Sequence, residues 1–269
     1  MIDGLRAAPR ISIVMPVHDA AQFLTTTLSS VVAQTFPDWE LLAVDDGSTD
    51  DSARLLNCAA AIDPRIRPLS TGINMGAPRA RNYAMDAARG RFLAFLDADD
   101  LWHPSKLAHQ LGVMETTGIP LSCTAYLRHN IETGQKTVIG VPERVSRRDL
   151  LKTNMIGCST VMMDTEFFGF RHMPLLRHGE DFAFWLELLT ATPFAMGLPQ
   201  VLTTYRQHSH SLSSVKKHAA TDVWTLYRHS LNLPLPAAVW YFCHYATRGL
   251  ARHRMPKLAR ALGWLQDGE

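Results

Sequence analysis

Residues 11–50 read ISIVMPVHDAAQFLTTTLSSVVAQTFPDWELLAVDDGSTD, and they carry most of the information about the fold. Residues 11–17 form a continuous apolar and β-branched run, which is typical of a strand buried on both faces. Residues 20–36 place apolar side chains at helical spacing, and Pro37 ends the helix. Residues 41–45 form a second apolar run. The stretch therefore predicts the strand, helix and strand of a βαβ unit.

The same alternation continues toward residue 96. Ser48, Thr49 and Asp50 are candidate N-caps for a helix that ends near residue 61. A third strand at 66–69, a helix at 77–88 and a fourth strand at 92–96 follow, and Gly90 suits a helix C-cap. We expect an α/β fold in which helices flank a mostly parallel central sheet.

The second half of the chain is less regular. We expect a hairpin around Thr133-Gly134, strands at 159–163 and 201–205, and helices at 181–189 and 222–230. From residue 234 onward the chain is helical in pattern, basic and aromatic. The simplest division is one α/β domain, residues 1–212, and a helical basic C-terminal extension, residues 213–269. A nucleotide-binding half at about 9–102 and an acceptor half at about 103–212 would make up the first domain.

Composition excludes several classes of protein. An apolar fraction of 46% and a charged fraction of 19% are those of an ordinary globular chain, not of a disordered, collagenous or coiled-coil chain. The four cysteines are scattered and form no C-x-x-C pair, so a disulfide framework or a zinc ribbon is not expected. This pattern favours a reducing compartment.

The charge is unevenly distributed along the chain. Residues 201–269 carry nine Lys and Arg against three Asp and Glu, whereas residues 1–200 are slightly acidic. The chain shows no zinc finger, basic zipper or RNA-binding aromatic motif, so we expect an anionic membrane surface, not nucleic acid, as the partner of the basic segment. No apolar run is of signal-peptide type or reaches the ~20 residues of a membrane span. We therefore expect a cytoplasmic protein, peripheral on the inner face of the cytoplasmic membrane.

Aromatic and basic side chains of the C-terminal segment would provide the membrane contact. They are Trp240, Tyr241, Phe242, Tyr245, Trp264, Arg248, Arg252, Arg254, Lys257 and Arg260. The alternative is a packed pair of terminal helices with a solvated basic face.

Carboxylates follow two of the predicted strands. Asp45 and Asp46 end the second strand, and Asp97, Asp99 and Asp100 follow the fourth. In a parallel sheet, ligands bind outside the carboxyl ends of the strands. Close carboxylates repel each other unless a cation or hydrogen-bond donors intervene, so this pattern predicts a Mg²⁺ or Mn²⁺ site. The alternative is that these residues only cap helices and form turns.

Several nucleotide-binding and hydrolytic motifs are missing. The chain has no G-x-G-x-x-G after the first strand, no G-x-x-x-x-G-K-[ST] and no G-x-S-x-G. A dinucleotide-binding Rossmann domain, a P-loop NTPase and an α/β-hydrolase are therefore disfavoured.

Four segments resemble the family 2 glycosyltransferases of the GT-A fold. Residues 11–52 resemble the opening strand, helix and V-D-D-G-S-T-D turn of the family, and residues 74–104 (NMGAPRARNYAMDAARGRFLAFLDADDLWHP) resemble the segment that leads into its D-x-D motif. Residues 177–188 (RHGEDFAFWLEL) resemble the E-D-x-x-F-W catalytic segment. Residues 204–214 (TYRQHSHSLSS) are similar to a stretch of nonprocessive members that build bacterial surface polysaccharides. The resemblance covers about residues 9–212.

The resemblance implies a UDP-sugar donor and assigns residues to it. Pro16, Val17 and His18 would line the nucleobase, and Asp46 would accept the uracil imide N–H. Arg79 or Arg81 would reach the uracil or the diphosphate, unless each lies on a solvated helix face.

The D-x-D segment and the later Y-R-x-H segment complete the implied donor site. Asp97, Ala98 and Asp99 would contact the ribose and the metal that bridges the phosphates, with Asp99 or Asp100 as the closer metal ligand. Arg206 and His208 would contact the diphosphate or the metal, or would lie on the surface.

The resemblance further implies Asp181 as the catalytic base, with Glu180 as the neighbouring alternative. Acidic residues are also common at helix N-termini without any catalytic role. Trp185, one turn further on, would stack on a sugar or lie in the core.

The implied function is an inverting, metal-dependent transfer of a sugar from a UDP-sugar to a saccharide acceptor. The acceptor would be a lipid-linked precursor of lipopolysaccharide, O-antigen or capsule. The alternative is a non-catalytic nucleotide-sugar-binding or scaffold protein with the same fold. A nucleotidyltransferase is disfavoured because residues 18–21 are not a Gly-rich basic loop.

Overall fold

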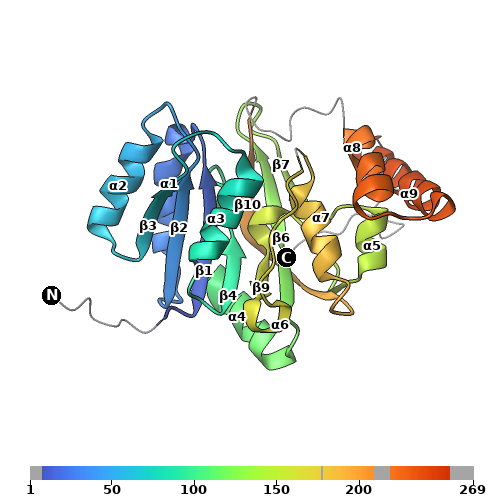
Figure 1. The fold of residues 1–269 in the computed structure, drawn as a ribbon, viewed down its shortest axis with the longest axis horizontal. Helices are drawn as coiled ribbons and strands as arrows, with labels where there is room; N and C mark the ends of the chain where they lie inside the picture. Colours follow the sequence, from blue (N-terminus) through green and yellow to red (C-terminus); the bar gives the residue numbers. More distant parts are fainter. Residues whose placement is uncertain (1–7, 177, 209–218, 255–269) are drawn as a thin grey trace.

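The computed structural model describes residues 8–176, 178–208 and 219–254. One sheet runs through the molecule with its strands in the order β3-β2-β1-β4-β9-β6-β10-β5, and β7 and β8 pair with β6 and β10 (Figure 1). The strands are β1 (Ile11–Val17), β2 (Trp39–Asp45), β3 (Ile66–Ser70), β4 (Phe92–Phe95), β5 (Leu101–Trp102), β6 (Leu121–Asn130), β7 (Lys136–Ile139), β8 (Arg144–Val145), β9 (Met162–Asp164) and β10 (Ala195–Gln207).

The first four strands are parallel to one another, as are β6 and β10. The antiparallel pairings involve β5, β7, β8 and β9, which all come from the second half of the chain. The predicted α/β fold with a mostly parallel sheet is confirmed.

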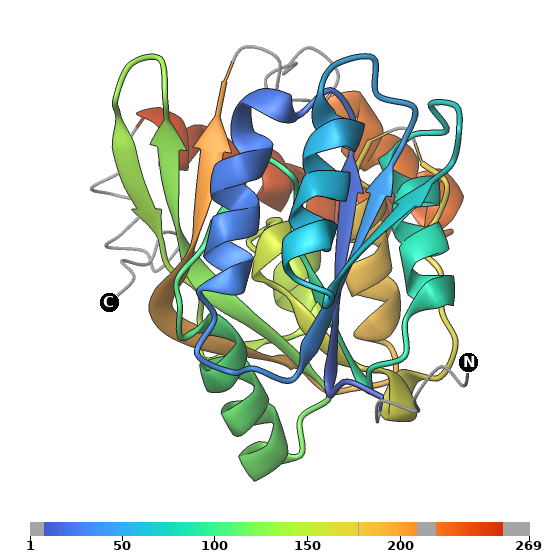
Figure 2. The ribbon, with the colours of Figure 1, turned by 90° about the vertical axis from the view of Figure 1, so that its left-hand side faces the viewer.

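Helices cover both faces of the sheet. On one face lie α1 (Ala21–Val32), α2 (Ser52–Ile62) and α4 (Lys106–Thr117). Helices α1 and α2 stand in front of the strands in Figure 2, and α4 lies at the lower edge of that view. On the other face lie α3 (Ala77–Ala87), α5 (Arg147–Lys152), α6 (Thr165–Phe168), α7 (Glu180–Leu188), α8 (Ala219–Thr225) and α9 (Leu235–Arg254). The sheet is therefore buried on both sides, which explains the continuous apolar runs of its central strands.

Strand β1 shows how one apolar run supplies two cores. Ile13 and Met15 pack toward α1 and α4, whereas Val14 between them packs toward α3 and α7. Successive side chains of a strand point to opposite faces, so every position of a central strand must be compatible with a buried environment. Polar residues are consequently displaced to the strand ends.

Two local predictions were wrong. The strand predicted at 159–163 begins only at Met162, after a 3₁₀ turn over Cys158–Thr160 in which the carbonyl of Ser159 accepts the indole N–H of Trp102 (2.8 Å). Gly90 does not cap α3, which ends at Ala87. A Cβ at Gly90 would lie 2.6 Å from the backbone nitrogen of Ser12, so glycine allows a close backbone approach there.

The C-terminal helices pack on the same core as α5 and α7. Tyr227, in the π-helical turn Leu226–Ser230 between α8 and α9, and Ala238 of α9 are fully buried.

The domain boundary predicted at residue 212 lies outside the described residues. Within the described ranges, no helix has the length and hydropathy to cross a membrane. All four cysteines are free.

The first residue of α4, Lys106, is a buried lysine. Lys106 is fully buried, its ammonium donates to the Gln110 amide oxygen (2.5 Å), and it lies 4.2 Å from the centre of the Trp102 ring. No carboxylate pairs with it in the described part of the chain. Burial lowers the pKa of Lys106 to about 7.

This environment makes stability depend on pH. An unfolded lysine titrates near 10.4, so between pH 7 and about 10 the unfolded chain binds one more proton than the folded chain. The contribution of Lys106 to the free energy of unfolding therefore rises by about 1.4 kcal/mol per pH unit across that window and is constant below it. We expect Lys106→Met to abolish this rise, measured by urea denaturation at pH 6, 7.5 and 9. The exposed Lys136→Met is the control, and an equal slope in all three proteins would contradict the prediction.

Candidate active site

The candidate site lies at the carboxyl ends of β1, β2 and β4, where α3 and the start of α7 meet the sheet. The guanidinium of Arg81, on α3, is at its centre, and Arg81 is only 5% exposed. Its two terminal nitrogens donate to Asp97 Oδ1 (2.6 Å) and Glu180 Oε1 (2.8 Å). One buried cation thus connects Asp97, two residues after β4, with the first residue of α7. The predicted direct contact of Arg81 with the nucleotide stays a prediction, since both ends of its guanidinium are engaged.

The acidic start of α7 contains the candidate base. Gly179 precedes the helix in a left-handed conformation (φ 74°), which lets the chain turn sharply into Glu180 and Asp181. The carboxyl of Asp181 is partly buried and accepts the N–H of Phe182 (2.7 Å). Burial raises the pKa of Asp181 to about 7, the charge of Glu180 adds to the rise, and Arg81 opposes it. A carboxyl with this pKa is suited to general-base chemistry near neutral pH.

Asp99 pairs with His208 at the end of β10. Its Oδ2 lies 3.0 Å from His208 Nε2, and the imidazole lies against the ring of Phe23, with centroids 4.5 Å apart. Burial raises the pKa of Asp99, and the neighbouring charge of Asp97 adds to it. The structure therefore brings together two residues that the sequence analysis assigned to metal binding from segments more than 100 positions apart.

Asp100 and Arg206 occupy a different environment. Asp100 is fully buried, accepts the backbone N–H of Arg206 (3.1 Å), and burial raises its pKa well above the ordinary value. The Arg206 guanidinium donates to the carbonyl of Asp99 and to the hydroxyls of Thr26 and Thr27 (2.8 Å each). Arg206 thus ties β10 to α1 and to the D-x-D loop. Metal binding by Asp100 and diphosphate binding by Arg206 stay predictions that these contacts do not favour.

Asp99 and His208 form a hydrogen-bonded pair whose spacing would also suit two ligands of a divalent cation. Two neighbouring ligands of an octahedral Mg²⁺ or Mn²⁺ lie roughly 3 Å apart, which matches the distance between Asp99 Oδ2 and His208 Nε2. Such ions are commonly held by one or two carboxylates with substrate phosphates and waters. Among the described residues no group of three His, Cys, Asp or Glu side chains is arranged to hold a metal. A site here would therefore draw its remaining ligands from the diphosphate.

The predicted nucleobase end is ordered by Asp46. Its buried carboxylate accepts the N–H groups of Met75 (2.9 Å) and Gly76 (2.7 Å) and the hydroxyl of Thr71 (2.9 Å). Three of its four lone pairs are thereby used, and one is left for the predicted uracil contact. The structure thus gives Asp46 a loop-ordering role, whereas its uracil role stays a prediction.

His18 lies beside this loop in a defined tautomer. Its Nε2 lies 2.9 Å from the Asn74 amide nitrogen, a donor, so Nδ1 carries the proton and donates to the carbonyl of Asp46 (3.0 Å). Of the other residues predicted here, Pro16 is partly exposed, whereas the side chains of Val17 and Ala98 are buried. Only the backbone of the last two can face a ligand.

Burial bears on two further predictions. Arg79 is exposed and forms no ion pair with any described residue, so it is available to an anion. Trp185 is fully buried against Phe95, with ring centroids 5.2 Å apart, and therefore belongs to the core. Stacking of Trp185 on a sugar is wrong.

The sequence analysis missed residues that hold the site in place. Thr71 and Asn74 support the nucleobase loop, Thr26 and Thr27 bind Arg206, and Ser159 accepts the N–H of Asp97 (3.0 Å). Asn74 was within a quoted motif and offered a signal. The hydroxyl residues offered none, because Ser and Thr are common in every loop and helix.

Solved structures share this fold. S. aureus TarS in complex with UDP-GlcNAc superposes with a TM-score of 0.70 at 19% identity, over 90% of this chain and 73% of that chain. The mannosyltransferase PcManGT from Pyrobaculum calidifontis, in complex with GDP-Man and Mn²⁺, gives 0.66 at 16% identity, over 96% and 79%. At these identities the likeness shows the GT-A fold alone.

The fold and the site together define a glycosyltransferase of the GT-A class. Residues 12–179, more than half of the chain, match the family described as Glycosyl transferase family 2. The chain belongs to this family.

Curated relatives extend the similarity beyond the matched segment. The putative teichuronic acid biosynthesis glycosyltransferase TuaG of Bacillus subtilis is 38% identical over 91% of this chain and 97% of its own length. The UDP-Glc:alpha-D-GlcNAc-diphosphoundecaprenol beta-1,3-glucosyltransferase WfgD of Escherichia coli is 32% identical over 90% and 94%. The resemblance to enzymes of bacterial surface-polysaccharide synthesis is thus confirmed.

The first prediction for this site concerns Arg81. Arg81→Met leaves the carboxylates of Asp97 and Glu180 without their shared cation, so we expect the free energy of unfolding to fall by about 3–5 kcal/mol. Because Arg81 lowers the pKa of Asp181, the acid limb of kcat/KM should also move to higher pH. Arg81→Lys keeps the charge and should restore the pH profile in part. The exposed Arg171→Met is the control, and an unchanged profile in Arg81→Met would refute the coupling.

The second prediction concerns the pH dependence of Asp181. A base with a pKa of about 7 is protonated below that pH, so kcat/KM should fall about tenfold per unit as the pH drops below 7. Asp181→Asn should lower kcat by roughly 10² or more, with the Kd for UDP little changed. A fully active Asp181→Asn variant together with an inactive Glu180→Gln variant would contradict the prediction and make Glu180 the catalytic base.

Proposed function

We propose that this glycosyltransferase inverts the anomeric centre, requires a divalent metal, and transfers a sugar from a UDP-sugar to a lipid-linked saccharide. The observation that carries the proposal is the Asp97–Arg81–Glu180 bridge, which holds the candidate base Asp181 beside the D-x-D loop. A donor diphosphate at the loop and an acceptor hydroxyl at Asp181 would then share one site.

In the proposed reaction, Asp181 takes the proton of the acceptor hydroxyl. The acceptor oxygen attacks the anomeric carbon, and the bond from that carbon to the diphosphate oxygen breaks on the opposite face. UDP leaves, and the configuration at the carbon is inverted. Glu180 is held by Arg81 (2.8 Å), so it is placed to keep the start of α7 in register while the neighbouring Asp181 acts.

Asp99 and His208 are the residues proposed to hold Mg²⁺ or Mn²⁺. When bound there, the ion would neutralise charge on the diphosphate and so assist departure of UDP. The relatedness to structures solved with UDP-GlcNAc and with GDP-Man and Mn²⁺ supports a nucleotide-sugar donor and a metal of this kind.

The relatives guide the proposed substrates. WfgD is named for UDP-Glc and for a GlcNAc-diphosphoundecaprenol acceptor, and TuaG is named for teichuronic acid biosynthesis. We propose an acceptor of the same kind, a saccharide on a lipid diphosphate, which places the enzyme at the cytoplasmic face of a membrane. Residues 1–212 would form the catalytic domain and residues 213–269 the extension that contacts the membrane.

A non-catalytic nucleotide-sugar-binding protein is the alternative. The raised pKa of Asp181 and its position beside Glu180 at the start of α7 argue against it, since perturbed carboxyls of this kind are concentrated at catalytic sites. A transfer assay separates the two functions.

The test is incubation with a panel of UDP-sugars and a GlcNAc-diphospho-lipid acceptor, with the product's anomeric configuration read by NMR. We expect transfer with Mn²⁺ or Mg²⁺, loss of transfer in EDTA, and a product of opposite anomeric configuration to the donor. Asp99→Asn should weaken Mn²⁺ binding and abolish its stimulation of transfer, whereas the exposed Asp51→Asn should behave as wild type. Full activity in EDTA would refute the requirement for a divalent metal. Retention of the anomeric configuration would refute the inverting mechanism.

A further inference from the structure

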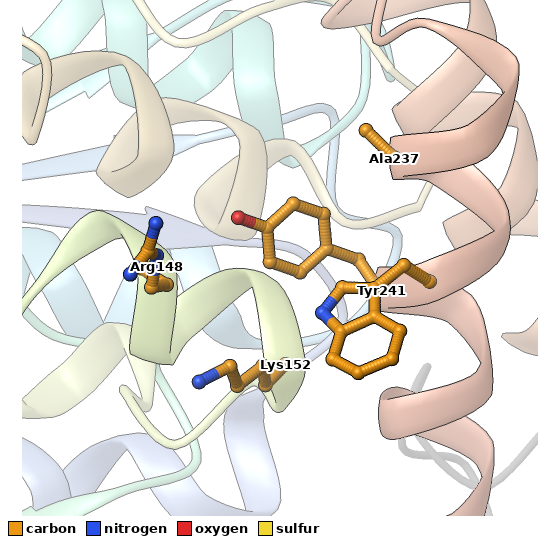
Figure 3. A pocket seen from close by; sticks show the side chains of 5 residues that line it. Arg148, Lys152, Ala237 and Tyr241 are labelled. Carbon is orange, nitrogen blue, oxygen red and sulfur yellow. The ribbon is translucent and has the colours of Figure 1, made fainter.

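A cavity of about 420 Å³ lies between α5 and α9, away from the carboxylates of the candidate active site. Arg148 and Lys152 of α5 line it together with Ala237, Trp240 and Tyr241 of α9. Figure 3 shows the Tyr241 ring extending from α9 toward the two basic side chains of α5. Arg148 and Lys152 are four residues apart on one helix, so both charges point to the same side.

The charge of this region is positive, although the charge of Asp149 acts on Arg248. Neither Arg148 nor Lys152 forms an ion pair with any residue that the structure describes. Burial lowers the pKa of His244, and the charges of Arg248 and Lys152 add to that effect, so these groups lie in one neighbourhood. The nearby Asp149 is committed to a capping box with Ser146 at the start of α5, and α9 contains no Asp or Glu.

From residue 235 to residue 250, the exposed face of α9 beside this cavity carries no charged side chain. The exposed residues from 235 to 250 are Leu235, Pro236, Val239, Trp240, Cys243, Ala246, Thr247 and Leu250. At 3.6 residues per turn they fall within an arc of about 140°. Trp240, which is 60% exposed, lies at the edge of the arc that faces the cavity. Arg248 follows on that same side, and with Arg148 and Lys152 it forms a cationic border along the apolar face.

We propose that this face of α9, together with the α5–α9 cavity, is a docking surface for an anionic phospholipid membrane. The apolar arc would enter the headgroup layer, and Arg148 and Lys152 would bind a lipid phosphate in the cavity under Trp240 and Tyr241. An uncharged face beside a row of cations, on a helix that does not meet the requirements for a span, is the pattern of a helix that lies in the interfacial plane. A soluble phosphate would use the cations but leave the apolar arc without a function. The inference rests on the proposed function, because a lipid-linked acceptor is what brings the enzyme to a membrane.

The opposite face of α9 connects this surface to the active site. Tyr245 stacks on Phe182 with ring centroids 6.5 Å apart, and Phe182 is the residue after Asp181. Phe242 meets Trp224 of α8 edge to face, with centroids 5.4 Å apart.

The packing of α9 corrects part of the predicted membrane contact. Tyr241, Phe242 and Tyr245 are partly buried against the core, so they are not exposed membrane anchors. Trp240 is left as the exposed aromatic residue of the described part of α9. The residues predicted beyond 254 lie outside the described residues.

The experiment measures binding of the full chain to vesicles by co-sedimentation and tryptophan fluorescence. Removing α9 would uncover Phe182 and Tyr227, so substitutions on the exposed surface are used instead of a truncation. The charge variant is Arg148→Gln/Lys152→Gln, and the apolar variant is Trp240→Ser. Matched controls at other places on the molecule are Arg54→Gln/Lys136→Gln and the 85% exposed Ile62→Ser.

We expect the wild type to bind phosphatidylglycerol vesicles and to bind neutral phosphatidylcholine vesicles weakly. The charge variant should lose roughly 30-fold in partition coefficient at low salt. At high salt, the difference in partition coefficient between the wild type and the charge variant should become smaller. Trp240→Ser should lower vesicle binding and remove the blue shift in tryptophan emission that the wild type shows on binding. Both control variants should bind as wild type. Inorganic phosphate at 10 mM should not compete with the vesicles.

Three results would overturn the inference: equal binding by the charge variant and its control, displacement by inorganic phosphate, or binding to neutral vesicles that depends only on an added lipid diphosphate. The last would assign the cavity to the acceptor instead of the membrane. Transfer to a short-chain, water-soluble acceptor is measured in parallel on the wild type. Transfer without vesicle binding refutes the docking surface alone, and vesicle binding without transfer refutes the proposed function alone.

Discussion

The buried guanidinium of Arg81 holds together the segments that form the site. It sits on α3 and donates to Asp97 after β4 and to Glu180 at the start of α7, which are distant in sequence. Without this cation, the carboxylates of Asp97, Glu180 and Asp181 would repel each other in a poorly solvated space. The same charge limits how far the pKa of Asp181 rises. One interaction thus sets both the shape of the site and the acidity of its candidate base.

The second half of the site depends on a similar arrangement around β10. Arg206 is used internally, binding the Asp99 carbonyl and the α1 hydroxyls, and it thereby carries His208 to the Asp99 carboxylate. The D-x-D loop is therefore held from two sides, by Arg81 through Asp97 and by Arg206 through the backbone of Asp99. Preorganisation of this kind allows a site to bind a diphosphate without first ordering its own loops.

The helix α9 joins the catalytic part of the molecule to its proposed membrane face. Its inner side packs Tyr245 on Phe182, one residue after the candidate base, and its outer side is apolar with a cationic border. Because α9 packs on the core beside the residue that follows the candidate base, the orientation of the docked enzyme and that of the base would be linked. A loosely tethered anchor would not give that link.

The sequence by itself determined the mostly parallel sheet, the succession of strands and helices in the first hundred residues and the family, because continuous apolar runs and motif spacing are local properties. It also indicated Asp99, His208, Glu180 and Asp181, since each lies in a recognisable segment. It did not determine which side chains meet. Only the tertiary structure decided that Arg81 binds two carboxylates and that Asp100 and Trp185 are buried. The same holds for the partial burial of Tyr241, Phe242 and Tyr245 against the core. The physical reason is that burial and ion pairing depend on which elements pack together, and residues far apart in sequence, such as Arg81 and Glu180, carry no local signal of their contact.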